Sequence, residues 1–207
     1  AAELHDKKLF KQPPPKDDCP ICFLQLPLEQ SGYKYMGCCG KTICCGCLHA
    51  PVYDDQGNIV VKKTCSFCRI PVPTSEEEAV KRELKRVDAN DPFAIYDLGC
   101  FYRDGLYGFP QDYTKSLELF LRAGELGYAL AYNNVGCAYD QGLGVEVDNE
   151  KSRHYYELAA MRGCVTARFN LGAREVYEGN HDRALKHWMI AVRGGDNASL
   201  ENIKRMY

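Results

Sequence analysis

The crowding of its cysteines is the feature that most narrows the folds open to this chain. Nine of the twelve cysteines lie between Cys19 and Cys68. Six of them form three Cys-x-x-Cys pairs, and a doublet precedes the second pair: Cys19/Cys22, Cys38-Cys39, Cys44/Cys47 and Cys65/Cys68. Two cysteines at this spacing direct their thiolates at one tetrahedral metal ion from a single tight turn. Eight sulfurs make two closed four-cysteine sites, so we expect two structural zinc ions with no position open to a substrate.

Disulfides are the alternative use of so many cysteines in a small domain. The residues ahead of Cys19 do not read as a secretory signal, and the adjacent residues Cys38 and Cys39 would pair awkwardly. The spacing therefore favours zinc over disulfides. We expect a reducing intracellular compartment, cytoplasmic or nuclear. Because the sequence begins at Ala1 and not at methionine, a targeting segment ahead of it stays an open alternative.

The composition is ordinary for a globular protein, with 45% hydrophobic residues, 26% charged residues and a net charge of −2 over 207 residues. This balance gives no reason to expect a nucleic acid as partner. Nor does any apolar run approach the roughly 18 residues that a membrane-spanning helix needs. We therefore expect no nucleic-acid binding and no membrane insertion.

Composition divides the chain into four parts. Residues 1–16 form a polar N-terminal arm, 17–73 the cysteine-rich module, 74–90 a linker helix and 91–207 a helical region. Ser75 and Glu78 have the spacing of a capping box, which predicts that the linker helix begins at this point. Val80, Leu84 and Val87 form one apolar stripe. We expect the helix to join two domains, and a stripe that docks a partner is the alternative.

An internal repeat fills the last part of the chain. Segment 94–102 (AIYDLGCFY) matches 131–139 (AYNNVGCAY) and 167–172 (ARFNLG), so that the shared glycines are 37 and 36 residues apart. A period in the mid-thirties predicts stacked helical hairpins. Asp112 and Asp148 stand where helix N-caps are needed, and Gly127 and Gly163 where left-handed C-caps are needed. We expect seven helices, namely three hairpins and a capping helix near 196–206.

These repeats resemble the Sel-one-like repeat, a relative of the tetratricopeptide repeat, over roughly Pro92 to Tyr207. The resemblance implies an all-α solenoid that works as a scaffold or receptor for other proteins. Each repeat carries two adjacent positions of mixed character, at 96–97, 133–134 and 169–170. They either line a concave peptide groove or are simply solvated. Cys100, Cys137 and Cys164 are expected to fill the helical core.

The order and gaps of the cysteine pairs resemble a RING finger over residues 19–73. In that family four ligand pairs interleave as a cross-brace. With the Cys38-Cys39 doublet counted as the second pair, the first and third pairs bind one zinc ion, and the second and fourth bind the other. The resemblance therefore implies one site of Cys19, Cys22, Cys44 and Cys47 and another of Cys38, Cys39, Cys65 and Cys68. The histidine ligand of most RING fingers is absent, because Lys41 stands in its place and Cys38 is the nearest substitute. His49 in place of Cys38, and Cys45 in place of Cys44, stay open.

RING fingers that act as ubiquitin ligases bind a ubiquitin-conjugating enzyme between their two zinc loops. Ile21 matches the apolar contact, and Arg69 matches the arginine that hydrogen-bonds both ubiquitin and the conjugating enzyme. Pro51 and Ser66 depart from the family's tryptophan and proline. Ile21 could instead pack the small core, and Arg69 could instead screen the zinc–thiolate charge.

The resemblance implies a RING-type ubiquitin-protein ligase. Its zinc module would recruit a conjugating enzyme and ubiquitin, and its repeats would hold a protein substrate or scaffold. Such a ligase acts by positioning, with no catalytic residue of its own. The alternative is a non-catalytic scaffold in which both modules only bind partners. A zinc hydrolase is disfavoured, since closed sites leave no coordination position for water.

Overall fold

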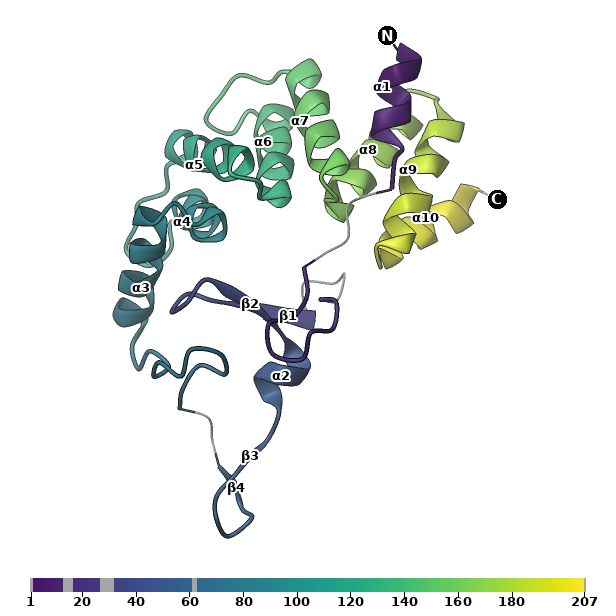
Figure 1. Ribbon diagram of the computed structural model, residues 1–207. Coiled ribbons are helices and arrows are strands. Elements are labelled where there is room, and N and C mark those ends of the chain that lie inside the picture. Colours follow the sequence, from purple (N-terminus) through teal and green to yellow (C-terminus); the bar gives the residue numbers. More distant parts are fainter. Residues whose placement is uncertain (1, 13–16, 27–31, 61–62, 207) are drawn as a thin grey trace. The chain divides into compact units, whose positions relative to one another are not determined.

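The computed structural model describes residues 2–12, 17–26, 32–60 and 63–206 (Figure 1). The chain divides into two compact units. One comprises residues 15–94, and the other comprises residues 1–14 together with 95–207. Residues 13–16, which end the polar arm predicted from the sequence, lie outside the described residues.

The cysteine-rich unit is built from short elements. Strands β1 (Tyr33–Met36) and β2 (Lys41–Cys44) pair antiparallel, from Tyr33 opposite Cys44 to Met36 opposite Lys41. Helix α2 (Cys45–His49) follows, and strands β3 (Val52–Tyr53) and β4 (Ile59–Val60) form a second hairpin. Among the described residues of this unit, the buried core consists of Leu26, Ile43 and two cysteines, with Tyr33 and Met36 packed against them. So small a core is typical of a domain that depends on cross-links or metal for its stability.

Helix α3 (Glu76–Asp88) begins where the sequence predicts. The Ser75 hydroxyl accepts a hydrogen bond from the Glu78 backbone N–H, and a Glu78 carboxylate oxygen accepts one from the Thr74 N–H. Both bonds satisfy backbone donors that the helix itself cannot pair. Asp91 caps the next helix in the same way, through the N–H groups of Phe93 and Ala94.

Seven helices follow between Pro92 and Met206, a stretch that is described throughout, and this confirms the predicted number. The first helices of the three hairpins are α4 (Pro92–Asp104), α6 (Ala129–Gln141) and α8 (Val165–Tyr177). The second helices are α5 (Tyr113–Glu125), α7 (Asn149–Met161) and α9 (His181–Arg193), and α10 (Asn197–Met206) ends the stack. Helices α5 to α10 pack against one another in chain order. The predicted N-caps are confirmed, because Asp112 and Asp148 each accept a hydrogen bond from the backbone N–H three residues on. Gly127 and Gly163 each lie one residue beyond the C-cap of α5 and α7, with positive φ of 104° and 92°.

The repeated glycines make room for aromatic rings. A Cβ atom on Gly136 would lie 2.7 Å from the Tyr156 ring, and one on Gly99 would lie 2.7 Å from the Phe120 ring. Gly172 faces the indole of Trp188 in the same way. Contacts this short are not tolerated in packed interiors. The glycine of each first helix therefore allows a ring from the second helix to lie directly on its backbone.

The N-terminal residues differ from the polar arm expected from the sequence. Residues Ala2–Leu9 form helix α1, which belongs to the unit that contains the solenoid (Figure 1). Leu9 is completely buried in the cluster that contains Tyr156 and Ala159 of α7. An eight-residue helix is marginal in water. The packing of Leu9 against α7 therefore explains why this polar segment is helical.

Candidate metal centres and repeat surfaces

The structure gathers eight cysteines into two clusters. The sulfur atoms of each cluster all lie within 4.8 Å of one another, in the sets Cys19/Cys22/Cys44/Cys47 and Cys38/Cys39/Cys65/Cys68. These are the two sets that the resemblance implies. Four ligands at about 2.3 Å in tetrahedral geometry lie roughly 3.8 Å apart. The distances of 3.8 Å from Cys22 to Cys44 and 3.4 Å from Cys38 to Cys68 are close to this value.

Two equivalent turns present the outer pairs of cysteines. In the first, the N–H of Phe23 donates to the Cys19 carbonyl at 2.9 Å, and in the second the N–H of Arg69 donates to the Cys65 carbonyl at 3.1 Å. Phe23 and Arg69 both adopt left-handed backbone angles, with φ of 58° and 64°. The backbone N–H of Phe67 lies 3.4 Å from the Cys65 sulfur. The fold thus repeats one ligand-presenting turn, once in each cluster.

The electrostatics of the thiols fit a bound cation. Burial opposes ionisation of Cys19, but backbone N–H groups outweigh it and lower the pKa of Cys19 to about 6. The same balance lowers the pKa of Cys65 to about 7. Burial and the neighbouring thiols raise the pKa of Cys38 and of Cys47. Four adjacent thiolates need a cation to offset their mutual repulsion. Each cluster can therefore hold a metal ion, and the chemistry of its donors fits one.

The two alternative ligands that the sequence analysis considered lie outside both clusters. Cys45, the first residue of α2, and His49, which is exposed at the end of that helix, belong to neither group. Cys38 belongs to the second cluster in the position where a histidine was missing. The geometry therefore favours the all-cysteine set over the two substitutions.

The residues expected to contact a conjugating enzyme lie at the surface. Ile21 is 36% exposed, and Arg69 is exposed beside the last cysteine of its turn. The sequence interpretation missed that each turn carries further exposed apolar side chains. Leu24 follows the first turn at 70% exposure, and Ile70 follows the second at 42%. A hydrophobic residue after each Cys-x-x-Cys pair was the available signal.

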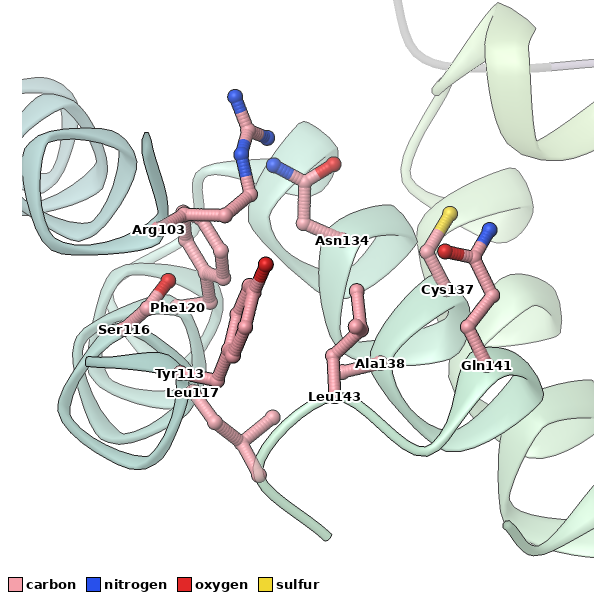
Figure 2. Close-up of a pocket in the computed structure, with 10 residues that line it drawn as sticks. All are labelled: Arg103, Tyr113, Ser116, Leu117, Phe120, Asn134, Cys137, Ala138, Gln141 and Leu143. Atoms are coloured by element: carbon pink, nitrogen blue, oxygen red, sulfur yellow. The ribbon is translucent and has the colours of Figure 1, made fainter. Parts of the chain in front are cut away.

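Between the first hairpin and the second, a pocket of about 170 Å³ opens among α4, α5 and α6. Figure 2 shows the Arg103 guanidinium, the Asn134 amide and the Tyr113 hydroxyl at the same rim of the pocket. Its walls are apolar, with Phe120 and Leu143 among them. Such a combination suits an amphipathic side chain of a partner protein. The sequence did not single out this pocket, because its residues come from three helices and a loop.

The polar positions of the repeats link one repeat to the next. The Asn170 amide donates to the Asn133 side-chain oxygen at 3.0 Å, and the Asn134 amide lies 3.4 Å from the Tyr96 hydroxyl. In each case the second position of one repeat bonds to the first position of the preceding repeat. Asn133 is only 3% exposed. These positions therefore hold the stack together, a role that neither sequence alternative included.

A buried ionic group lies in the last hairpin and was not predicted. The Glu175 carboxylate of α8 accepts hydrogen bonds from Arg153 of α7 at 3.0 Å and from Arg183 of α9 at 3.1 Å. Burial favours the neutral carboxylic acid, but the two arginines outweigh this effect and lower the pKa of Glu175. Arg168 and His187 are almost completely buried beside it. Charged residues at core-facing helical positions were the sequence signal for this group.

The repeat region is similar to known proteins in both sequence and structure. The sequence profile of the Sel1 repeat matches two consecutive segments of the solenoid, residues 92–128 and 129–164. The crystal structure of a Sel1 repeat protein from Oxalobacter formigenes is similar, with 28% identity and a TM-score of 0.60 over 66% of this chain and 57% of that one. The structure of c5321, a protective antigen of uropathogenic Escherichia coli, has 26% identity and a TM-score of 0.59 over 66% and 30% of the two chains. The all-α solenoid is thereby confirmed.

Two curated relatives are similar over part of the chain. The ERAD-associated E3 ubiquitin-protein ligase component HRD3B of Arabidopsis thaliana is 32% identical over 88 residues, which are 42% of this chain and 13% of the relative. Chitin synthase regulatory factor 3 of Schizosaccharomyces pombe is 32% identical over 80 residues, 39% of this chain and 9% of the relative. This chain thus spans a small fraction of the length of these relatives. Among the described residues, none of the helices has both the length and the apolar character needed to cross a bilayer.

Proposed function

We propose that this protein is an interaction scaffold whose Sel1 repeats bind a partner protein. The observation that carries the proposal is the amphipathic pocket among α4, α5 and α6, which opens on a solenoid of stacked repeats. Solenoids of this kind present extended binding surfaces. The two relatives are named as a ligase component and a chitin synthase regulatory factor, and both names describe proteins that act with other proteins. The same role for this chain is the simplest use of its repeats.

The cysteine-rich unit contributes a second surface. Each cluster of four cysteines would hold one zinc ion, which supplies structural cross-linking in place of a large hydrophobic core. A closed tetrahedral site leaves no position for a substrate. The surface that the two turns present, and not the metal, is therefore the functional part of this unit.

The scaffold proposal is tested by reversing a charge at the pocket. Arg103→Glu changes the rim of the pocket, and Lys115→Glu, an exposed residue of α5 outside the pocket, is the matched control. Tagged wild-type and variant proteins would be isolated from the source cells, and the recovered partners quantified by mass spectrometry. We expect at least one partner to fall fivefold or more with Arg103→Glu alone. Identical recoveries in all three samples would contradict a partner site at this pocket.

A second candidate function is that of a RING-type ubiquitin ligase, and it is favoured by one specific arrangement. The pairs Cys19/Cys22 and Cys44/Cys47 share one cluster. Ile21 and Arg69 are exposed on the turns of the two clusters. An exposed arginine with a planar guanidinium suits simultaneous hydrogen bonds to ubiquitin and to a conjugating enzyme. The module would then accelerate ubiquitin transfer by positioning alone.

Reconstituted ubiquitination separates the two candidates. The zinc-loaded protein would be incubated with activating enzyme, ubiquitin and a broad panel of conjugating enzymes. For a ligase, Arg69→Ala lowers chain formation at least fivefold at unchanged zinc content, whereas Lys63→Ala, an exposed neighbour, has no effect. No chain formation with any enzyme of the panel would rule out the ligase and leave the scaffold.

A further inference from the structure

Helix α1 binds the solenoid as a peptide ligand would. Leu9 is completely buried against α7, and the Phe10 ring lies 4.7 Å from the His187 ring of α9. The Asp6 carboxylate accepts two hydrogen bonds from Arg183 of α9, at 2.7 and 2.8 Å. Asp6, Leu9 and Phe10 are spaced i, i+3 and i+4, which places them on one face of the helix. Asp6, Leu9 and Phe10 are therefore three anchors of α1, beside the contact of 3.1 Å between His5 Nε2 and the Glu157 carboxylate of α7.

The face beneath α1 selects for an acidic residue. Arg183 uses its Nε to bind the buried Glu175, so its Nη1 remains for an incoming carboxylate. Lys186 lies 5.6 Å from the centre of the Phe10 ring, and Arg183 lies 5.4 Å from it. Cations over an aromatic face add to the preference for an aromatic residue at that position. The chemistry of this face thus calls for a carboxylate followed, one turn later, by an apolar and an aromatic side chain.

Helix α1 leaves part of this face unsatisfied. Arg168 is 2% exposed, and its Nε and Nη2 atoms lack a hydrogen-bond partner among the described residues. The same is true of Nε2 of His187, which is completely buried, and of one oxygen of Glu175. Buried polar groups without partners are unfavourable, and they call for an ordered water or for a hydrogen-bonding group of a ligand. A partner that brings hydrogen-bonding groups to this face would bind it better than α1 does.

The hold of α1 on this face is modest. The helix has eight residues, Leu4 is 60% exposed, and the side chains of the Asp6–Arg183 ion pair are 44% and 30% exposed. Exposed ion pairs contribute little, and short isolated helices are marginal in water. What favours α1 is that it is covalently attached, which makes its binding to this face intramolecular.

We propose that the face of α7, α8 and α9 beneath α1 is a docking site for a partner helix with the pattern Asp-x-x-Leu-Phe, and that α1 occupies it as an intramolecular ligand. The partner displaces α1 and takes over its three anchors. This proposal rests on the solenoid as a partner-binding surface but requires neither the pocket among α4, α5 and α6 nor the zinc module. A failure of the pocket test or of the ubiquitination test therefore leaves it standing.

The test supplies α1 in trans. A fluorescent peptide of residues 1–12 is titrated into full-length, zinc-loaded protein, either wild type or with Leu9→Asp, which removes the buried anchor of the attached α1. We expect saturable binding to the Leu9→Asp protein at least tenfold tighter than to wild type, because the site is vacated. In the peptide, Asp6→Lys and Phe10→Ala should each weaken binding at least tenfold, whereas the exposed Lys8→Ala should not.

Two results would overturn the proposal. One is a Leu9→Asp protein that keeps its helical circular dichroism but does not bind the peptide. The other comes from hydrogen exchange of the wild-type protein. This experiment does not need the variant, so it decides the question even if Leu9→Asp fails to fold. A replaceable α1 must open often, so its amides should exchange at least a hundredfold faster than those of α9. Equal protection of α1 and α9 would make α1 a permanent part of the fold.

Discussion

Because Gly172 lies close to Trp188, we predict that Gly172→Ala destabilises the protein, although helix propensity alone would predict stabilisation. Gly172 lies inside α8, where alanine is ordinarily preferred over glycine by about 1 kcal/mol. Here a Cβ atom would lie 2.5 and 2.8 Å from two carbon atoms of the Trp188 indole. The indole is only 4% exposed, and its N–H donates to the Phe169 carbonyl at 3.2 Å, so the ring cannot move aside freely.

The magnitude follows from these two opposing effects. Overpacking a core in this way costs about 1–3 kcal/mol, and three ring atoms closer than 3 Å place Gly172→Ala at the upper end. Subtracting the gain of about 1 kcal/mol in helix propensity leaves a net loss of about 2 kcal/mol. With a urea dependence of about 2 kcal/mol per molar, the unfolding midpoint should fall by about 1 M.

The assay uses the chain's own reporter. Trp188 is the single tryptophan of the sequence, and its fluorescence shifts to longer wavelength when the solenoid unfolds in urea. Ala173→Gly, at the exposed neighbouring position, measures helix propensity alone and should cost about 1 kcal/mol. In a Trp188→Leu background, followed by circular dichroism, Gly172→Ala should no longer destabilise the protein. A gain of about 1 kcal/mol from Gly172→Ala in the wild-type background would refute the reasoning.

Three further predictions follow from the clusters and from the buried polar groups. Cys38→Ala should lower the zinc content from two ions per chain to one, measured by plasma mass spectrometry, and Cys45→Ala should leave it at two. Burial, with the nearby Arg168 charge, lowers the pKa of His187 to about 3, so below pH 6.5 the unfolded chain takes up a proton that the folded chain does not. Stability in urea should therefore fall as the pH drops from 6.5 toward 3, by at most about 1.4 kcal/mol per pH unit, and His187→Gln should flatten that slope; equal slopes would contradict the assignment. Asn170→Ala should cost about 1–2 kcal/mol by leaving the side-chain oxygen of the buried Asn133 without its donor, and an unchanged urea midpoint would count against the inter-repeat bond.

Local signals in the sequence predicted much of the repeat region. The 37- and 36-residue spacings give the helical hairpins, and the caps at Asp112 and Asp148 place the helix starts. These features depend on neighbouring residues, whose backbone needs are the same in any chain. The spacing of the cysteines likewise limited the clusters to a few combinations. Spacing alone could not give their membership, because the pairs that meet are more than 20 residues apart; the RING resemblance implied the two sets that the structure shows.

The sequence by itself thus determined the architecture of the repeats and the number of metal-competent thiols, since both follow from spacing along the chain. Only the tertiary structure decided that α1 returns to the far end of the solenoid, where Asp6 meets Arg183 across 177 residues. It also decided that the asparagines of the repeats bond to one another and that Arg168 and His187 are buried. Contacts of this kind depend on where helices from distant segments of the chain lie in the fold, and the periodicity of the sequence does not predict those positions.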